Sequence, residues 1–317
     1  MILRSFPDVW PPTPANAAYR AAFYTRWGRE NAVVRARAAT AEFPPFTQTL
    51  SIKAAWGGTE SYFIGGRRLA VDDDSYLVLN EGQTYASELR EPRPIDSIGI
   101  FFRPRMAQAL CGELVAGLAG ALDDGPAPRE RPLAFAEHLR RNDELVTPRL
   151  RALVAAIDTG EDDETWLEEE LTQLLARLVQ AERGFHRRSD SIEALRPATR
   201  RELLTRVERA ADYLLSCYAE SLALDDIAAA ARLSKYHLVR LFRRVYGVTP
   251  HAFLQRKRAA VARRLIETTD DDLSDIALAA GFGTRFTMFR QLRRCFGASG
   301  VALRRGAARA SVAGARR

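Results

Sequence analysis

Short stretches in which hydrophobic and polar residues alternate fill residues 47–102. Glycine pairs at 57–58 and 65–66 and the turn at 80–82 separate these stretches. Many short strands at close spacing, broken by turns that contain glycine, are typical of an antiparallel sandwich or barrel. We therefore predict a β-rich N-terminal domain, and the pattern is compatible with either architecture.

Hydrophobic residues recur every three or four positions between Met106 and Phe185, which predicts helices beside the sheet. In 162–185, leucines follow this spacing behind an acidic first turn, where carboxylates favour the helix dipole. The hydrophobic face of this helix fits two roles equally well. It either pairs with a second copy of the chain or packs on its own domain.

A polar stretch with a proline at position 197 and no sustained hydrophobic face begins near residue 187, and everything after it is helical. We therefore predict an N-terminal domain over 1–190, a linker over 191–199, an all-helical domain over 200–305 and a disordered tail over 306–317.

An internal repeat occupies the helical domain. Residues 226–231 recur 49 positions later at 275–280, and residues 240–247 recur 50 positions later at 290–297. Each repeat has the pattern of a helix, a tight turn and a second helix. Ser234 and Thr284 are placed to cap the second helices, because a hydroxyl can accept a hydrogen bond from an unpaired backbone N–H. Glycine follows each of these helices, as it commonly does at helix ends.

The outward faces of the two second helices are rich in arginine. Arg240 and Arg290 are the best candidates to contact bases, because arginine pairs bidentately with guanine in the major groove. Val239 and Phe289 are candidates for contact with thymine methyl groups. The remaining arginines on these faces are more suited to phosphates, which position a protein without specifying sequence. The complete set of candidate DNA-binding residues is Ser234, Lys235, Tyr236, Val239, Arg240, Arg243, Arg244, Thr284, Arg285, Phe286, Phe289, Arg290, Arg293 and Arg294.

Each of these residues also has a simpler interpretation. An arginine on an amphipathic helix is often only solvated, although the recurrence in both repeats favours a function. Tyr236, Phe286 and Phe289 could equally pack against neighbouring helices.

A helix predicted over 250–268 joins the two repeats. Nineteen residues at about 1.5 Å each span roughly 28 Å. That length can hold two recognition helices near one turn of DNA apart, about 34 Å. One chain could therefore contact two successive segments of the major groove.

Charge is divided unevenly along the chain, which carries 47 basic and 40 acidic residues in total. Residues 196–317 hold 24 basic and 11 acidic residues, a net charge of +13, whereas residues 1–195 have a net charge of −6. A basic domain joined to an acidic one indicates that the basic domain binds a polyanion.

Several classes of protein lack support in the sequence. We find no apolar run near the ~20 residues that a membrane span needs, and the N-terminus does not resemble a signal peptide. The cysteines at 111, 217 and 295 lack paired or metal-ligand spacing, and we expect each to be a core residue in a cytoplasmic protein. No phosphate-binding glycine loop, nucleophile elbow or metal cluster indicates an enzyme.

Short motifs in the helical domain follow a known pattern. They lie at 226–228, 234–238, 240–243, 247–250, 256–258, 275–277 and 281–282. On these motifs, residues 207–297 resemble the AraC/XylS family of bacterial transcription regulators. The resemblance implies two helix-turn-helix units, joined by a helix, that bind adjacent major grooves through the outward positions named above.

The second repeat departs from the family pattern. Phe286 stands where a small polar residue is usual, and Leu292 and Leu303 stand where aromatic residues are usual. Gly300 lies in the segment where the family has a proline. We therefore expect the first repeat to make most base contacts, and the second to contact mainly phosphates or apolar base edges.

The N-terminal half is similar to the cupin-type regulatory domain that many family members carry, on residues 76–80 and 101–104. The expected fold class is α+β: a cupin-like β-barrel with flanking helices, then an all-α domain of two helix-turn-helix units joined by a long helix. All four histidines lie outside 47–102, so we expect neither a metal nor a cofactor in the barrel. Such a barrel would instead enclose a small ligand.

These observations predict a sequence-specific, DNA-binding transcription regulator in bacteria that a small ligand or a partner controls at the N-terminal domain. Double-stranded DNA, an unidentified small effector and a second copy of the chain are the expected partners, and RNA polymerase is a further candidate. Two alternatives stay open. One is a cupin-type enzyme with an accessory helical domain, and the other is an architectural DNA binder without sequence preference.

Overall fold

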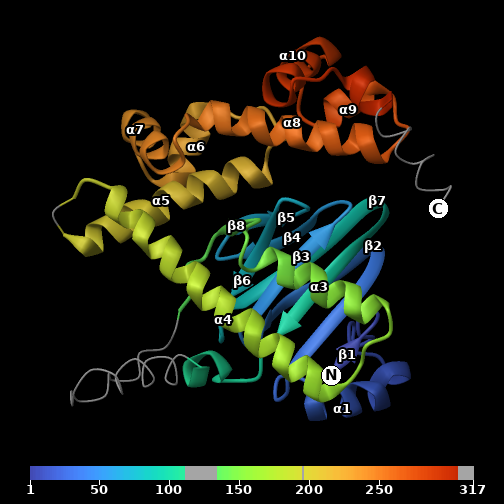
Figure 1. Cartoon of the computed structure of the whole chain (residues 1–317). Helices are drawn as coiled ribbons and strands as arrows, with labels where there is room; N and C mark the ends of the chain where they lie inside the picture. The colour runs from blue at the N-terminus through green and yellow to red at the C-terminus, as the bar shows by residue number, and fades with distance from the viewer. Residues whose placement is uncertain (111–133, 195, 306–317) are drawn as a thin grey trace. The chain divides into compact units, whose positions relative to one another are not determined.

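The computed structural model describes residues 1–110, 134–194 and 196–305. The chain forms two compact units, Met1–Arg188 and Ser189–Arg317, here called the N-terminal and C-terminal units (Figure 1). The division falls within two residues of the predicted domain limit at 190. Cys111 and the predicted tail at 306–317 lie outside the described residues.

The N-terminal unit contains a mostly antiparallel sheet. Its strands are β1 (Ile2–Leu3), β2 (Ala32–Thr47), β3 (Ser51–Trp56), β4 (Glu60–Ile64), β5 (Arg67–Val71), β6 (Ser75–Leu79), β7 (Thr84–Phe101) and β8 (Leu139–Arg141). They are ordered β1-β2-β7-β3-β6-β8, while β4 pairs with β7 and β5. Among the described strands this order does not close on itself. A β-rich, mixed α+β fold is therefore confirmed, whereas a closed barrel is not.

The long strand β7 organises the sheet. It pairs with β2 along most of its length. Its first half also pairs with β4, with Leu89 opposite Glu60. Its second half pairs instead with β3, with Phe101 opposite Ser51. Register shifts in the β2–β7 ladder, after Ala38 and after Phe43, let the strands bend between these two partners.

Helices cover one face of this sheet. These are α3 (Thr147–Asp158) and α4 (Glu164–Arg188) (Figure 1). Successive side chains of a strand point to opposite faces. Ile52 and Ile98 accordingly belong to the buried cluster that includes Leu150 and Leu171 of the helices. Lys53, next to Ile52, faces the other way, toward a cavity covered by the N-terminal segment and α1 (Ala17–Arg26).

The C-terminal unit is helical in its described residues. Its α-helices are α5 (Pro197–Ser216), α6 (Leu224–Ala231), α7 (Lys235–Tyr246), α8 (Pro250–Thr268), α9 (Leu273–Ala279) and α10 (Arg285–Phe296). The first repeat corresponds to α6 and α7, and the second to α9 and α10. Helix α5 starts inside the predicted linker, because proline is well suited to the first turn of a helix.

No helix in the described part of the chain is both long and apolar enough to cross a membrane.

Candidate nucleic-acid interface

Helix α7 has one buried face and one exposed face. Leu238, Leu241 and Phe242 are buried in the C-terminal unit. Phe242 also stacks on Tyr246, with 4.6 Å between ring centroids, and contacts Phe253 of α8 edge-on at 5.3 Å. These contacts fix the rotation of α7 about its axis, and so determine which side chains point outward.

Both ends of α7 are capped as the sequence predicts. The Ser234 hydroxyl accepts a hydrogen bond from the His237 backbone N–H at 3.3 Å. Gly247, with a φ of 72°, ends the helix in the left-handed conformation that glycine tolerates best. Helix α10 repeats this arrangement with Thr284 at its start and Gly297 at its end.

The turns between the paired helices differ. In the first repeat Arg232 takes the left-handed conformation, with a φ of 52°. In the second repeat Gly281 takes it, with a φ of 78°, and lies against the segment that follows α5. A Cβ atom at Gly281 would lie 2.6 Å from the Tyr218 carbonyl oxygen. Only glycine therefore fits this turn without displacing backbone.

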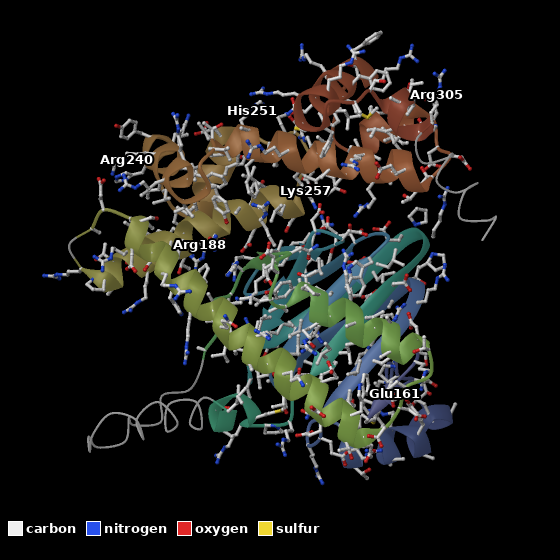
Figure 2. The ribbon with its side chains drawn as sticks, viewed as in Figure 1. Glu161, Arg188, Arg240, His251, Lys257 and Arg305 are labelled. Carbon is white, nitrogen blue, oxygen red and sulfur yellow. The ribbon has the colours of Figure 1, made fainter. Side chains whose placement is uncertain are left out.

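Most of the predicted DNA-binding residues are exposed. On α7 these include Arg240, labelled in Figure 2, and Arg243. On α10 they include Arg290 and Arg293. None of these four guanidinium groups has a hydrogen bond or ion pair within the described residues. The two helices thus present unpaired cations at equivalent positions, where a polyanion can reach them.

Two of the predicted cations already have partners in the protein. Lys235 Nζ lies 2.8 Å from Asp225 Oδ1 of α6. Arg244 donates to the Ser191 carbonyl oxygen at 2.7 Å and pairs with Glu193 at 2.8 Å. A phosphate would have to compete with these partners, so Arg244 is less suited to binding DNA than its neighbours on α7.

The aromatic candidates fall into two groups. Tyr236 and Phe286 are 77% and 73% exposed, so neither is packed within its unit. Phe289, by contrast, is half-buried and packs against the cluster formed by α8, α9 and α10. Its ring occupies the space beside Gly300, where a Cβ atom would lie 2.5 Å from the ring. This placement matches the packing interpretation of Phe289, whereas Val239 is half-buried on α7.

Arg258 of α8 has a structural role that its motif alone did not indicate. Its guanidinium donates to the Tyr218 and Glu220 carbonyl oxygens, each at 2.7 Å. These bonds tie α8 to the loop between α5 and α6, and the same loop contacts Gly281. Arg258 therefore links α8, the helix between the repeats, to the loop that precedes α6 and lies against Gly281 of the second repeat.

The N-terminal unit contains a cavity of about 300 Å³ that sequence reasoning left without named residues. Its lining includes Lys53 and Glu60, which are only 4% and 3% exposed. A lysine within the mostly apolar stretch at 50–55 is the feature that could have indicated this cavity. No cluster of three or more metal-ligating side chains occurs within the described ranges.

Comparison with known proteins places the C-terminal unit in context. Residues 227–306 match a family model described as a helix-turn-helix domain. The chain is 38% identical over 100 residues to the transcriptional activator NphR of a Rhodococcus species, which covers 32% of this chain and 29% of NphR. It is 29% identical over 184 residues to the HTH-type transcriptional activator RhaS of Enterobacter sp. (strain 638), covering 56% of this chain and 61% of RhaS. It thus spans less than two thirds of either relative.

A solved structure from Chromobacterium violaceum, of a transcriptional regulator with an AraC-type DNA-binding domain, is 27% identical to the chain. The match covers 32% of this chain and 92% of that one, with a TM-score of 0.31.

Proposed function

We propose that the chain is an AraC/XylS-type, sequence-specific DNA-binding regulator of bacterial transcription, because residues 227–306 match a helix-turn-helix family model and the chain is similar to named transcriptional activators. In this proposal the two repeats act as helix-turn-helix units, and α7 and α10 enter successive segments of the major groove. The unpaired arginines at equivalent exposed positions of α7 and α10 are the observation that carries the proposal.

The physical basis of the proposal is the separation of two roles on each helix. The buried face orients the helix, so the exposed arginines are held where they can contact base edges or phosphates. Helix α8 sets the spacing, since its 19 residues span roughly 28 Å at about 1.5 Å each. Recognition helices of paired units lie about 34 Å apart when they bind one face of the duplex.

The first repeat would make most of the base contacts. Its exposed face presents Tyr236, Arg240 and Arg243, and it follows the family pattern from which the second repeat departs at Phe286. The second repeat would contribute Arg290, Arg293 and the exposed ring of Phe286.

The N-terminal unit would sense a small ligand and bring two chains together. The hydrophobic face of α4 is buried against the sheet of its own unit, so the contact between chains would use another surface. Since chromosomal DNA lies in the bacterial cytoplasm, the protein would act there, with RNA polymerase as a further partner. Sedimentation equilibrium of the full chain tests the dimer, which doubles the apparent mass if the proposal is right.

Selection of bound duplexes from a random DNA pool by the full-length chain tests the main proposal. We expect two enriched blocks about 10 base pairs apart, centre to centre, and stronger enrichment at the block that α7 contacts. The selected site should retain its binding against a large excess of random duplex, because specific sites typically bind about 10³-fold or more tighter. Equal binding of selected and random DNA would instead identify an architectural binder without sequence preference.

A further inference from the structure

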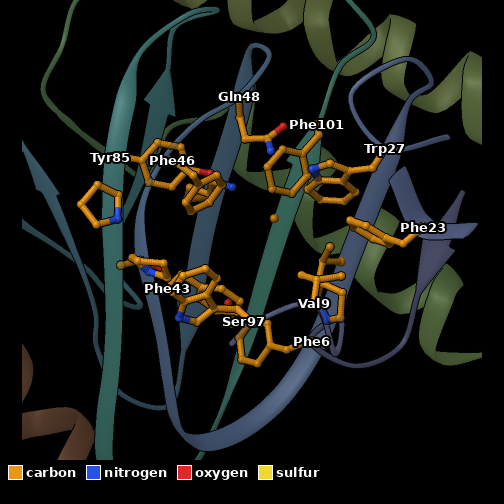
Figure 3. A pocket seen from close by; sticks show the side chains of 18 of the residues that line it. Phe6, Val9, Phe23, Trp27, Phe43, Phe46, Gln48, Tyr85, Ser97 and Phe101 are labelled. Carbon is orange, nitrogen blue, oxygen red and sulfur yellow. The ribbon is translucent and has the colours of Figure 1, made fainter. Parts of the chain in front are cut away.

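The cavity of the N-terminal unit has aromatic walls. It lies on the face of the sheet opposite α3 and α4. Trp27 contacts Phe23 and Phe101, with ring centroids 4.7 Å and 4.5 Å away. Phe46 and Tyr85 form a second group, 4.6 Å apart. Figure 3 shows the two groups on opposite sides of the cavity. A flat, apolar ligand can therefore contact aromatic rings on both sides.

Lys53 places a primary amine between these walls. Its Nζ lies 3.6 Å from the ring centroid of Phe101 and 5.2 Å from that of Tyr85. The residue beside it on β7 is Gly99, and a Cβ atom there would come within 3.4 Å of Nζ. Within the described residues, no acceptor forms a hydrogen bond with this nitrogen. A buried amine without an acceptor is costly, so a ligand that supplies one would be bound preferentially.

The acidic group of the cavity is already satisfied by the protein. Glu60 Oε2 accepts a hydrogen bond from the Ser97 hydroxyl at 2.7 Å. The Tyr62 and Ser87 hydroxyls also favour the charged form of this carboxyl group and so oppose the rise of its pKa. Glu60 thus has hydroxyl groups of the protein to stabilise it, whereas Lys53 has no hydrogen-bond acceptor within the described residues. A ligand that completes the hydrogen bonding of the cavity must therefore supply an acceptor for Lys53 and not a donor for Glu60.

Burial shifts both groups toward their neutral forms. Desolvation lowers the pKa of Lys53 to about 7, and the charge of Glu60 opposes this shift. Desolvation likewise raises the pKa of Glu60, although its hydroxyl donors act in the opposite direction. An anion beside Lys53 would favour the ammonium form, because an opposite charge close by stabilises it.

We propose that this cavity binds a planar aromatic carboxylate, whose ring lies between the two aromatic walls and whose carboxylate accepts a hydrogen bond from Lys53 Nζ. A neutral arene would occupy the space between the aromatic walls but would leave Lys53 Nζ without a hydrogen-bond acceptor. An aromatic amine would meet a carboxylate that already has its donors. The assignment rests on the proposed function only in treating the N-terminal unit as the sensing unit.

Isothermal titration of the full-length chain with benzoate, 2-naphthoate, 2-naphthamide and 2-naphthylmethylammonium tests the proposal. We expect at least one of the two acids to bind. We expect 2-naphthoate to bind about tenfold or more tightly than either the neutral amide or the ammonium compound. The proposal is overturned if neither acid binds, or if the amide or the ammonium compound binds as tightly as the acid.

Substitution of Lys53 by methionine separates the role of the amine from that of the walls. Methionine has a similar length, and the variant should keep its fold because Nζ makes no hydrogen bond within the described residues; circular dichroism checks this. We expect Lys53→Met to bind 2-naphthoate and 2-naphthamide equally. Arg37→Met, which removes an exposed cation of β2 outside the cavity lining, should retain the preference for the acid. Retention of that preference in Lys53→Met would refute the assignment.

The lysine itself offers a direct readout, since the chain has lysines only at 53, 235 and 257. In protein labelled with ¹⁵N-lysine, 2-naphthoate should raise the titration midpoint of Lys53 Nζ and leave the other lysines unchanged. An unchanged Lys53 midpoint at saturation would contradict the proposed contact.

DNA binding is measured separately from ligand binding. A chain that selects a DNA site but binds neither acid would disprove the ligand assignment and leave the proposed function standing. A chain that binds the acid but prefers no DNA sequence would disprove the proposed function and leave the ligand assignment standing.

Discussion

Replacement of Arg240 by alanine should weaken specific DNA binding and relax the preference for one base pair. Arg240 is exposed in the middle of α7, and the buried residues beside it, Leu241 and Phe242, are left in place. Arginine and alanine are both good helix formers, so the helix should persist. Any loss of affinity then reports the missing guanidinium rather than a change of fold.

The expected magnitude follows from the chemistry of one base contact. A bidentate arginine–guanine contact contributes about 1–3 kcal/mol of discrimination against the wrong base. At about 1.4 kcal/mol for each factor of ten, Kd for the selected site should rise roughly 5- to 150-fold. Kd for random duplex should change much less, because phosphate contacts dominate that binding.

Arg244 provides a matched control on the same helix. Its guanidinium is held by Ser191 and Glu193, so fewer of its hydrogen bonds are free for DNA. We expect Arg244→Ala to weaken binding less than Arg240→Ala does. Its effect should also be equal for the selected and the random duplex.

Fluorescence anisotropy with the selected duplex, and with duplexes changed at one base pair each, measures all of these effects. Arg240→Ala should lose discrimination at one position and keep it at the others. Parental affinity in the variant would refute the proposed contact. A uniform loss across all duplexes would assign Arg240 to a phosphate instead of a base.

Three further predictions concern stability, and the positions of the tryptophans help to measure them, since all four lie in the N-terminal unit. Gly281→Ala should lower the free energy of unfolding of the C-terminal unit by at least about 2 kcal/mol, because of left-handed strain and the clash with the Tyr218 carbonyl oxygen. In urea, the unfolding transition of this unit followed by circular dichroism should move to a lower concentration, and the transition followed by tryptophan fluorescence should not change. Gly300→Ala should lower the free energy of unfolding of the same unit by about 1–3 kcal/mol, because the added methyl group would overpack against Phe289. An unchanged urea transition would mean that the Phe289 ring moves aside freely. Lys53→Met should stabilise the N-terminal unit at pH 7 by up to about 5 kcal/mol, from a native pKa of about 7 against 10.5. Between these two pKa values the unfolded parent binds the proton that its native state lacks, so parental stability rises with pH and the tryptophan-detected advantage of the variant should shrink toward pH 10.5.

Local rules explain why the helices of the C-terminal unit could be predicted closely. The caps at Ser234 and Thr284 and the ends at Gly247 and Gly297 depend on residues within one or two turns. The two-residue alternation of a strand is just as local, but it failed for β2, which begins at Ala32 although strands were expected only from residue 47. Many of its positions are half-buried or exposed, and a proline pair interrupts the pattern.

Two features that the local sequence pattern does not predict, the continuity of β7 and the cavity, depend on pairing between strands that are far apart in the chain. Residues 90–94 in the middle of β7 are polar apart from two prolines, a composition that favours an interruption of the strand. It stays continuous because β2 pairs with it on both sides of that segment. The cavity has the same origin, since Lys53 and Gly99 are neighbours only through the β3–β7 ladder. A lysine in a short, mostly apolar stretch gives no indication of which rings will surround it.

The departures of the second repeat from its family have unequal consequences. Leu292 is fully buried, so it changes the packing of α10 and not its exposed face. Gly300 and Phe289 fit one another, since any larger residue at 300 would collide with the Phe289 ring. Phe286 alone alters the surface, where its exposed ring lies 5.6 Å from the Arg285 guanidinium. An apolar ring at this place favours contact with a thymine methyl group over hydrogen bonds to a base edge. On the proposed DNA-binding face the two repeats therefore differ mainly at one aromatic position, where the exposed ring of Phe286 lacks the hydroxyl group that Tyr236 carries in the first repeat.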